Sequence, residues 1–412
     1  MYNLRKDVIF SVFVQFSLMV FGLLINKLLS NHLSVEEYGQ FNIIKRTATI
    51  ISFVLLAGMG IAIPKYVPQN KTDIGKFQYI FSGFFLVLMI SVVFFVGILV
   101  FESKANDIIF NGDEDIMVAY FYGISITFLS FLYAYYRGLN KILSFNLIQM
   151  LVQFLILVVA YFCTKNVFVF IKYSIVVNFG VFVVFSLLEG KKYFKIGQKV
   201  IKENLIPSLK ELWSFGYSRM VGDLFLFSLT AVPLLIVNKK FTEVEVAYFS
   251  VAITLTSLVS PIFSYIGVIL LPKVSQAMAE NKIHEVFKTI NKFMAMYIVL
   301  SVGIIGFIYL FDDFLIRLFF SAEYLPSKNI IFWVSFGILP NALYLLLRNP
   351  IDAYSKIPFN TINLIIACVI GFSMMWYSEH FLQIGKSYLV LQIILGVLSF
   401  VVWGVMKKKE NV

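Results

Sequence analysis

Long apolar runs separated by short polar loops dominate the chain. A bilayer core about 30 Å thick requires roughly 20 consecutive apolar residues in a helix. The pattern therefore predicts twelve spans, at about 8–29, 41–63, 77–101, 117–136, 145–163, 167–188, 215–237, 247–271, 290–311, 328–347, 358–377 and 385–406. Strands that cross a membrane alternate in polarity and close into a barrel, whereas these runs are continuously apolar. We therefore expect helices throughout.

The charges in the loops indicate the orientation of these spans. An even number of spans places both termini on one side of the membrane, which we assign to the cytoplasm. The loops on that side then carry 21 lysine and arginine residues, and the opposite loops carry 7. This split agrees with the positive-inside rule and supports the count of twelve.

The middle of the chain separates two halves of similar length. The lysine-rich segment 189–214 has apolar residues at four- or five-residue spacing, which predicts an amphipathic basic linker on the cytoplasmic leaflet. It divides an N-lobe, residues 1–188 with spans one to six, from a C-lobe, residues 215–412 with spans seven to twelve and a basic tail.

The two lobes resemble a diverged repeat. At an offset of 208 residues the matches are Ser34 with Thr242, Glu37 with Glu245, Phe41 with Phe249, Ile43 with Val251, and Pro64-Lys65 with Pro272-Lys273. Because six spans is an even number, the repeats run parallel. The expected fold is an all-α integral membrane protein with twelve transmembrane helices, in two six-helix lobes around a central cavity.

Composition narrows the class of protein further. The chain is 60% hydrophobic and 14% charged, whereas soluble domains have roughly 25% charged residues. This excludes a soluble enzyme, a nucleic-acid-binding module and a disordered chain. The net charge of +11 lies mostly in the cytoplasmic loops, so we expect membrane lipids, and no nucleic acid, as partners.

Several kinds of chemistry find no motif in the sequence. Gly385-Lys386-Ser387 imitates the end of a P-loop, but His380 stands where its first glycine is required. The two cysteines lie in apolar runs and the three histidines are scattered, so we expect no metal site and no cofactor. Filter-like loops and large outer loops are missing, which disfavours a channel and an enzyme. A secondary transporter remains.

Arg219 and Asp223 are the clearest charged pair inside a span. An ionised side chain at a helix centre costs about 2.5–3.5 kcal/mol on insertion scales, so it should face a cavity or a partner. Four residues apart, the two share a helix face and can pair. Either they form a structural ion pair, or Arg219 faces the substrate path and Asp223 binds a coupling ion.

Five further cations are candidates for a cationic substrate path. Lys45 and Arg46 are adjacent, so they diverge by about 100° on a helix, and we expect one of them to face the central cavity. Snorkelling to the interface is the alternative for both and for Lys172. Arg137 and Arg348 end the fourth span of each lobe; they either attract a phosphate group or are ordinary positive-inside residues.

Three segments carry a resemblance to a known family. They are residues 33–41 (LSVEEYGQF), 58–66 (GMGIAIPKY) and 136–141 (YRGLNK), which adjoin the first two spans and the fourth. With the twelve spans in two lobes, they make the chain similar to the Wzx, or O-antigen transporter, family of polysaccharide-precursor flippases. That family belongs to a superfamily (MOP) that also includes multidrug antiporters.

The resemblance implies translocation of an undecaprenyl-diphosphate-linked oligosaccharide across the bacterial cytoplasmic (inner) membrane. The lobes would alternate between inward- and outward-open states, coupled to H⁺ or Na⁺, and a polysaccharide polymerase and a chain-length regulator would be possible partners. The alternative is a multidrug and toxin extrusion (MATE) antiporter, which the excess of intramembrane cations over anions disfavours. A membrane polymerase or glycosyltransferase is the third reading.

Overall fold

The computed structural model describes residues 4–112, 115–162, 166–200, 205–261, 263, 283–355 and 358–410. Within these residues the chain forms helices joined by short turns, and no strand occurs. The helices group into two compact units, Met1–Phe227 and Ser228–Val412, and the division falls inside helix α8.

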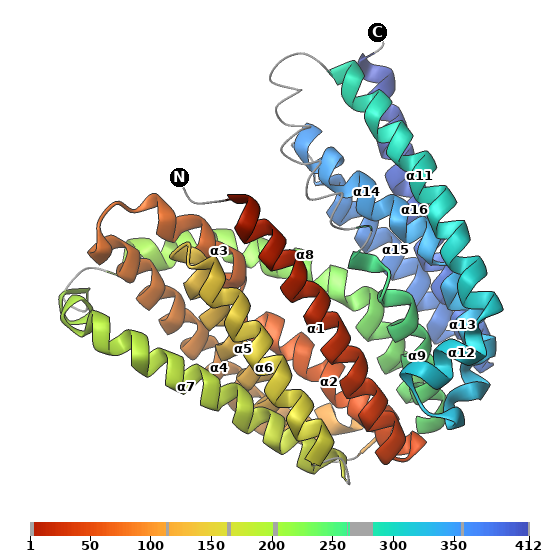
Figure 1. Cartoon of the computed structure of the whole chain (residues 1–412), viewed down its shortest axis with the longest axis horizontal. Helices are drawn as coiled ribbons and strands as arrows, with labels where there is room; N and C mark the ends of the chain where they lie inside the picture. Colours follow the sequence, from red (N-terminus) through yellow and green to blue (C-terminus); the bar gives the residue numbers. More distant parts are fainter. Residues whose placement is uncertain are drawn as a thin grey trace. The chain divides into compact units, whose positions relative to one another are not determined.

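The first unit is a bundle of long helices (Figure 1). Its elements are α1 (Leu4–His32), α2 (Val35–Leu56), α3 (Met59–Tyr66), the 3-10 turn η1 (Val67–Gln69), α4 (Asp73–Ile109), α5 (Ile116–Gly138), α6 (Ile142–Phe162), α7 (Val167–Val200) and the first part of α8 (Ile206–Lys240). Helix α5 is central to this unit, because it packs on α2, α3, α4 and α7.

The second unit begins in the latter part of α8. It contains α9 (Glu243–Ser257), α11 (Ile283–Leu310), α12 (Asp312–Phe319), the 3-10 turn η2 (Ala322–Ser327), α13 (Lys328–Ser335), α14 (Ile338–Tyr354), α15 (Phe359–Trp376) and α16 (Phe381–Glu410). Helix α16 packs along α14 and α15. Phe287 of α11, Leu347 and Ile351 of α14 and Trp403 of α16 form a buried apolar cluster in this unit.

The helices confirm an all-α multi-pass membrane protein. Ten helices in the described part of the chain are long and apolar enough to cross a bilayer. The pair Ala322–Ser335 and Ile338–Asp352, bent by 46°, adds an eleventh at the predicted span 328–347. The predicted span 247–271 is only partly described, because α9 ends at Ser257 and residues 264–282 lie outside the described ranges.

The predicted linker 189–214 is helical at both of its ends. Helix α7 continues to Val200, and α8 already begins at Ile206. Residues 201–204 lie outside the described part of the chain.

The internal repeat predicted from the sequence is visible in the helix caps. Ser34 caps α2 and Thr242 caps α9, and each forms a capping box with the glutamate three residues later. Phe41 and Phe249 are buried, each against an aromatic ring of another helix in its own unit: Phe170 of α7 and Tyr388 of α16. The matched Pro272-Lys273 lies outside the described residues.

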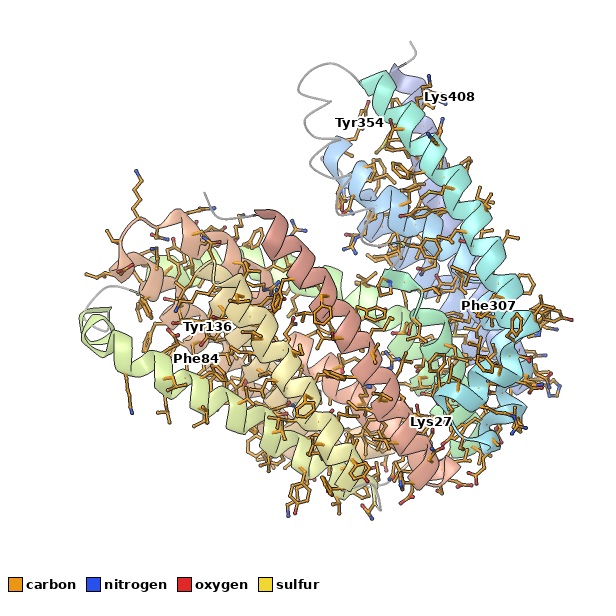
Figure 2. The ribbon with its side chains drawn as sticks, viewed as in Figure 1. Lys27, Phe84, Tyr136, Phe307, Tyr354 and Lys408 are labelled. Atoms are coloured by element: carbon orange, nitrogen blue, oxygen red, sulfur yellow. The ribbon has the colours of Figure 1, made fainter. Side chains whose placement is uncertain are left out.

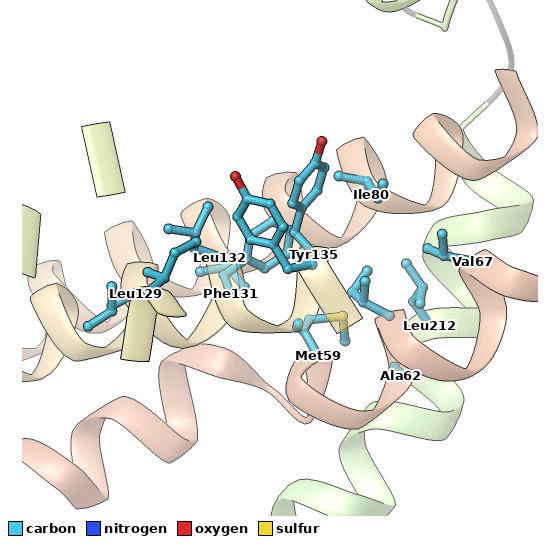
Figure 3. Close-up of a cluster of buried hydrophobic side chains, with 14 of the residues drawn as sticks. Met59, Ala62, Val67, Ile80, Leu129, Phe131, Leu132, Tyr135 and Leu212 are labelled. Carbon is cyan, nitrogen blue, oxygen red and sulfur yellow. The ribbon is translucent and has the colours of Figure 1, made fainter. Parts of the chain in front are cut away.

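A buried apolar cluster joins α3 to its neighbours in the first unit. Met59, Ala62 and Val67 meet Leu129–Tyr135 of α5 and Leu212 of α8 (Figure 3). The broken second span, the fourth span and α8 therefore share one core, and this core supports the site described below.

Polar and apolar side chains are distributed as a membrane requires. Val92, Val93 and Val100 of α4 are 62%, 70% and 67% exposed, as expected for side chains that face lipid. Lys27 lies in the last turns of α1 and Lys408 at the end of α16 (Figure 2). Lysines at span ends reach the interface without burying their charge.

Candidate functional site

A break in the second span is the main departure from a regular helix in the first unit. The sequence predicts one continuous helix over 41–63, but α2 ends at Leu56 and α3 begins at Met59. Between them Ala57 (φ 48°) and Gly58 (φ 73°) adopt left-handed backbone conformations. Glycine tolerates this conformation at no steric cost, which explains Gly58 within the segment 58–66.

The same break allows an unusually close approach to α8. A Cβ atom on Gly58 would overlap the carbonyl oxygen of Gly216, and one on Gly216 would overlap that of Ala57. Small residues at such a contact let two backbones meet inside a membrane. Glycine is therefore required on both sides of this contact.

Arg137 donates a hydrogen bond to a carbonyl of α3 that has no backbone donor. Pro64 lies four residues after Gly60 and has no N–H group, so the Gly60 carbonyl loses its helical donor. The Arg137 Nη2 donates to this carbonyl oxygen at 2.7 Å. The guanidinium also lies 5.3 Å from the centre of the Phe145 ring. Arg137 thus fastens the broken span to α5 and α6.

This fastening explains why two of the sequence segments go together. Segment 58–66 contains the break, the free carbonyl and Pro64, and segment 136–141 contains Arg137 and the turn that follows α5. Gly138 packs against the Ile63 carbonyl, and Asn140 (φ 57°) takes a left-handed conformation in the turn. The two segments contact each other in the folded chain.

A cavity of about 260 Å³ lies beside Arg137, entirely within the first unit. Its wall contains Phe53, Leu56, Gly58, Gly60, Ile61, Ser130, Tyr133, Arg137, Phe145, Gln149, Met220 and Asp223. The Nε of Arg137 is buried and has no hydrogen-bond partner among the described residues. One cation, one carboxylate and the amide of Gln149 therefore line an otherwise mainly apolar space.

Asp223 and Arg219 occupy different surroundings. Asp223 is half-buried in the cavity wall, whereas Arg219 is exposed and lies over Phe215, with 5.5 Å from Cζ to the ring centre. Phe215, Arg219 and Asp223 share one helix face, and helical side chains lean toward the N-terminus. Arg219 therefore lies on Phe215 instead of pairing with Asp223.

The remaining predicted cations are spread over several helices. Lys45 is exposed and lies 5.5 Å from the Phe41 ring centre; Arg46 is half-buried and lies 5.7 Å from that of Phe227. These neighbours diverge, as the helix geometry predicts. Lys172 is exposed on α7, and Arg348 is half-buried on α14 in the second unit. Of the predicted site residues, the structure brings Arg137 and Asp223 together in one cavity.

A second polar cluster at the end of α5 was missed in the sequence. Glu189 of α7 forms an ion pair with Lys141 at 2.9 Å and accepts from the Tyr135 hydroxyl at 3.0 Å and the Tyr136 hydroxyl at 3.5 Å. Tyrosines near the ends of spans are typical of the membrane interface, so on their own they do not indicate a polar cluster. The one sequence feature that could have indicated this cluster is Glu189, an acidic residue at the start of a lysine-rich stretch.

Comparisons with known proteins place this geometry in a family. The model of the family described as polysaccharide biosynthesis protein matches residues 4–278. The chain is similar in structure to an inward-facing multidrug resistance MATE family transporter of the MOP superfamily: TM-score 0.78, 14% identity, 95% of this chain and 94% of the transporter. It is also similar to the lipid II flippase MurJ in an inward closed conformation: TM-score 0.71, 17% identity, 97% of this chain and 87% of MurJ. No curated protein sequence matches the chain.

The family match extends over more than half of the chain and includes all three sequence segments that carry the resemblance. The structural likenesses are low in identity and concern the fold, which they cover almost completely. The chain therefore belongs to the polysaccharide biosynthesis protein family and has the fold of the MOP superfamily transporters.

Proposed function

We propose that this protein is a flippase for an undecaprenyl-diphosphate-linked oligosaccharide, the repeat unit of O-antigen or a similar surface polysaccharide. The observation that carries the proposal is its membership of the polysaccharide biosynthesis family, joined to a fold that matches a lipid II flippase over 97% of the chain. The structural neighbour is named as a flippase of lipid II, and the family is described by a role in polysaccharide biosynthesis. Together these names favour a lipid-linked polysaccharide precursor as the substrate.

The proposed substrate needs cations along its path. A diphosphate is bound by charge-assisted hydrogen bonds, which arginine and lysine supply. We assign this role to Arg219, Lys45, Arg46, Lys172, Arg137 and Arg348. Arg137 is the best supported, because its buried Nε has no hydrogen-bond partner in the described part of the chain and its side chain lines a cavity.

Coupling to an ion gradient is assigned to Asp223. Its half-buried carboxylate lines a cavity whose other walls are mainly apolar. A carboxylate in such surroundings exchanges H⁺ or Na⁺ as access alternates between the two sides. In this proposal the second span bends at Ala57-Gly58, while Arg137 holds α3 through the Gly60 carbonyl.

The proposed setting is the bacterial inner membrane, with both termini in the cytoplasm. In this proposal the protein is a secondary transporter and not an enzyme. A polysaccharide polymerase and a chain-length regulator are its proposed partners.

A MATE-type multidrug antiporter is the second candidate. One observation favours it: the TM-score to a MATE transporter, 0.78, exceeds the 0.71 to MurJ. The family match and the number of cations in the spans favour the flippase.

Deletion of the gene separates these candidates. For a flippase, the lipid-linked oligosaccharide accumulates in the inner leaflet and surface polysaccharide is lost, while drug sensitivity stays unchanged. For an antiporter, cells become hypersensitive to cationic drugs and keep their surface glycan. The matched control is complementation with the intact gene, which restores the phenotype in either case.

A further inference from the structure

A second group of cations lies at the end of α3, apart from the Arg137 cavity. The Lys65 Nζ is 3.6 Å from the centre of the Phe215 ring, and the Arg219 Cζ is 5.5 Å from it. The two cationic groups are thus at most roughly 9 Å apart, comparable with the Debye length of about 8–10 Å. Like charges so close repel each other unless an anion lies near them.

The ring that carries them is held in place from several sides. Tyr66 meets Phe215 edge-on, with ring centres 5.7 Å apart, and stacks on Tyr79 at 5.7 Å. The Tyr79 hydroxyl is hydrogen-bonded to the Glu211 carboxylate. The Glu211 carboxylate therefore accepts a hydrogen bond from the same aromatic cluster that packs on Phe215.

Among the described residues, Lys65 and Arg219 have no acidic partner. In the part of the chain that the structure describes, neither Lys65 nor Arg219 has a carboxylate within 4.0 Å. Both side chains are exposed. Their positive charge is thus available to a ligand.

A hollow of about 560 Å³ adjoins the ring. It is lined by Tyr66, Pro207, Lys210, Glu211, Ser214, Phe215 and Ser218, so it adds a third cation and the hydroxyl group of Ser214. The Ser218 hydroxyl donates to the Phe215 carbonyl oxygen at 3.0 Å. Glu211 is the acidic residue in its wall, and its carboxylate already accepts from Tyr79. Phosphate oxygens accept hydrogen bonds from cationic side chains and from hydroxyl groups.

The neighbouring aromatic residues indicate the depth of this hollow in the membrane. Trp213 and Tyr217 of α8 are 43% and 52% exposed, and their ring centres are 5.8 Å apart. Exposed tryptophan and tyrosine mark the level of the lipid headgroups, where phosphate groups lie.

From this arrangement we propose that Lys65, Arg219 and Lys210, arranged around Phe215, form a binding site for a phosphate group at the end of α3. The ligand is either the headgroup of a phosphate-bearing lipid or a soluble phosphate anion. The inference deepens the proposed function, because the diphosphate of a lipid-linked oligosaccharide is such a group and this site would receive it before translocation.

Binding to the full-length protein in nanodiscs of phosphatidylcholine tests the proposal. The probes are farnesyl diphosphate, inorganic pyrophosphate and farnesol, and the measurement is the dissociation constant from thermophoresis. Farnesyl diphosphate is expected to bind. Lys65→Gln and Arg219→Gln are each expected to weaken it roughly tenfold, since each removes a hydrogen bond to a charged group. Lys71→Gln, a matched loss of one exposed lysine in the turn between η1 and α4, leaves binding unchanged.

The three probes separate the possible ligands. Binding of farnesyl diphosphate without pyrophosphate supports a lipid headgroup, and equal binding of both supports a soluble phosphate anion. Equal binding of farnesol overturns the proposal, as does an equal loss in Lys71→Gln. Phe215→Leu keeps an apolar side chain and is expected to weaken binding as well. The binding measurement does not depend on transport. If no phosphate binding is found, the proposed site is wrong, and the flippase activity is tested separately by the transport assay.

Discussion

The contact between Arg137 and the Gly60 carbonyl allows a sharp test of how the second span is held. If Arg137 replaces the N–H group that Pro64 lacks, Arg137→Ala leaves a buried carbonyl without a donor. An unsatisfied buried group costs about 1–3 kcal/mol, and loss of the contact with Phe145 adds roughly 0.5–1 kcal/mol.

Pro64→Ala should rescue this defect. Alanine restores a backbone N–H group four residues after Gly60, so the carbonyl no longer depends on Arg137. In the Pro64→Ala background, Arg137→Ala should therefore cost only the contact with Phe145. Hydrogen bonds measured by double-mutant cycles in a membrane protein average about 0.6 and reach about 1.7 kcal/mol, and we expect a coupling free energy in that range.

The assay is the free energy of unfolding of the purified protein in mixed micelles, measured for the two single variants and the double variant. Pro233→Ala is the matched control, because it removes a proline inside α8, at a position that Arg137 does not contact. Pro233→Ala and Arg137→Ala should add within roughly 0.3–0.5 kcal/mol. A coupling between Pro64→Ala and Arg137→Ala that is no larger than this would refute the assigned role of Arg137.

Three other predictions follow from the packing, the caps and the cavity. Gly216→Val should abolish the yield of folded protein because its side chain overlaps the backbone of the broken span, whereas Gly222→Val, with open space around its Cβ, should keep the yield in size-exclusion chromatography; equal yields would contradict the close contact. Ser34→Ala and Thr242→Ala should each lower the free energy of unfolding by about 1 kcal/mol, and a loss at one cap alone would contradict their equivalence. Asp223→Asn should remove the dependence of flipping in proteoliposomes on an imposed H⁺ or Na⁺ gradient while the protein stays folded, and an unchanged dependence would exclude Asp223 as the coupling site.

Much of the fold follows from physical rules that act locally in the sequence. The length of apolar runs predicts the spans, because each helix must satisfy its own backbone in lipid. Ser34 and Thr242 are each followed three residues later by a glutamate, which is the pattern of a capping box. The two caps therefore align at the offset of 208 residues. The bend after Ser335 and the break after Leu56 do not follow, since the apolar runs continue through both.

The candidate site depends on contacts between distant segments, and these limit what the sequence predicts. Pro64 indicates that the Gly60 carbonyl lacks its helical hydrogen-bond donor. The packing of α5 decides which side chain donates to that carbonyl instead. The pairing expected for Arg219 and Asp223 rests on their spacing alone, which fits Phe215 and Arg219 equally well. The N-terminal lean of helical side chains decides between them, and the same lean places Lys45 over Phe41.

The proposed activity is movement of a lipid-linked oligosaccharide between leaflets. The most direct measurement reconstitutes the full chain in proteoliposomes with a fluorescent polyprenyl-diphosphate oligosaccharide and follows its exposure to an impermeant glycosidase or quencher outside. We expect the inner-leaflet pool to become accessible in the presence of the protein and an ion gradient, and to stay protected in liposomes without protein. A pool that stays protected in both, while the same vesicles transport a cationic drug, would contradict the flippase and establish the antiporter.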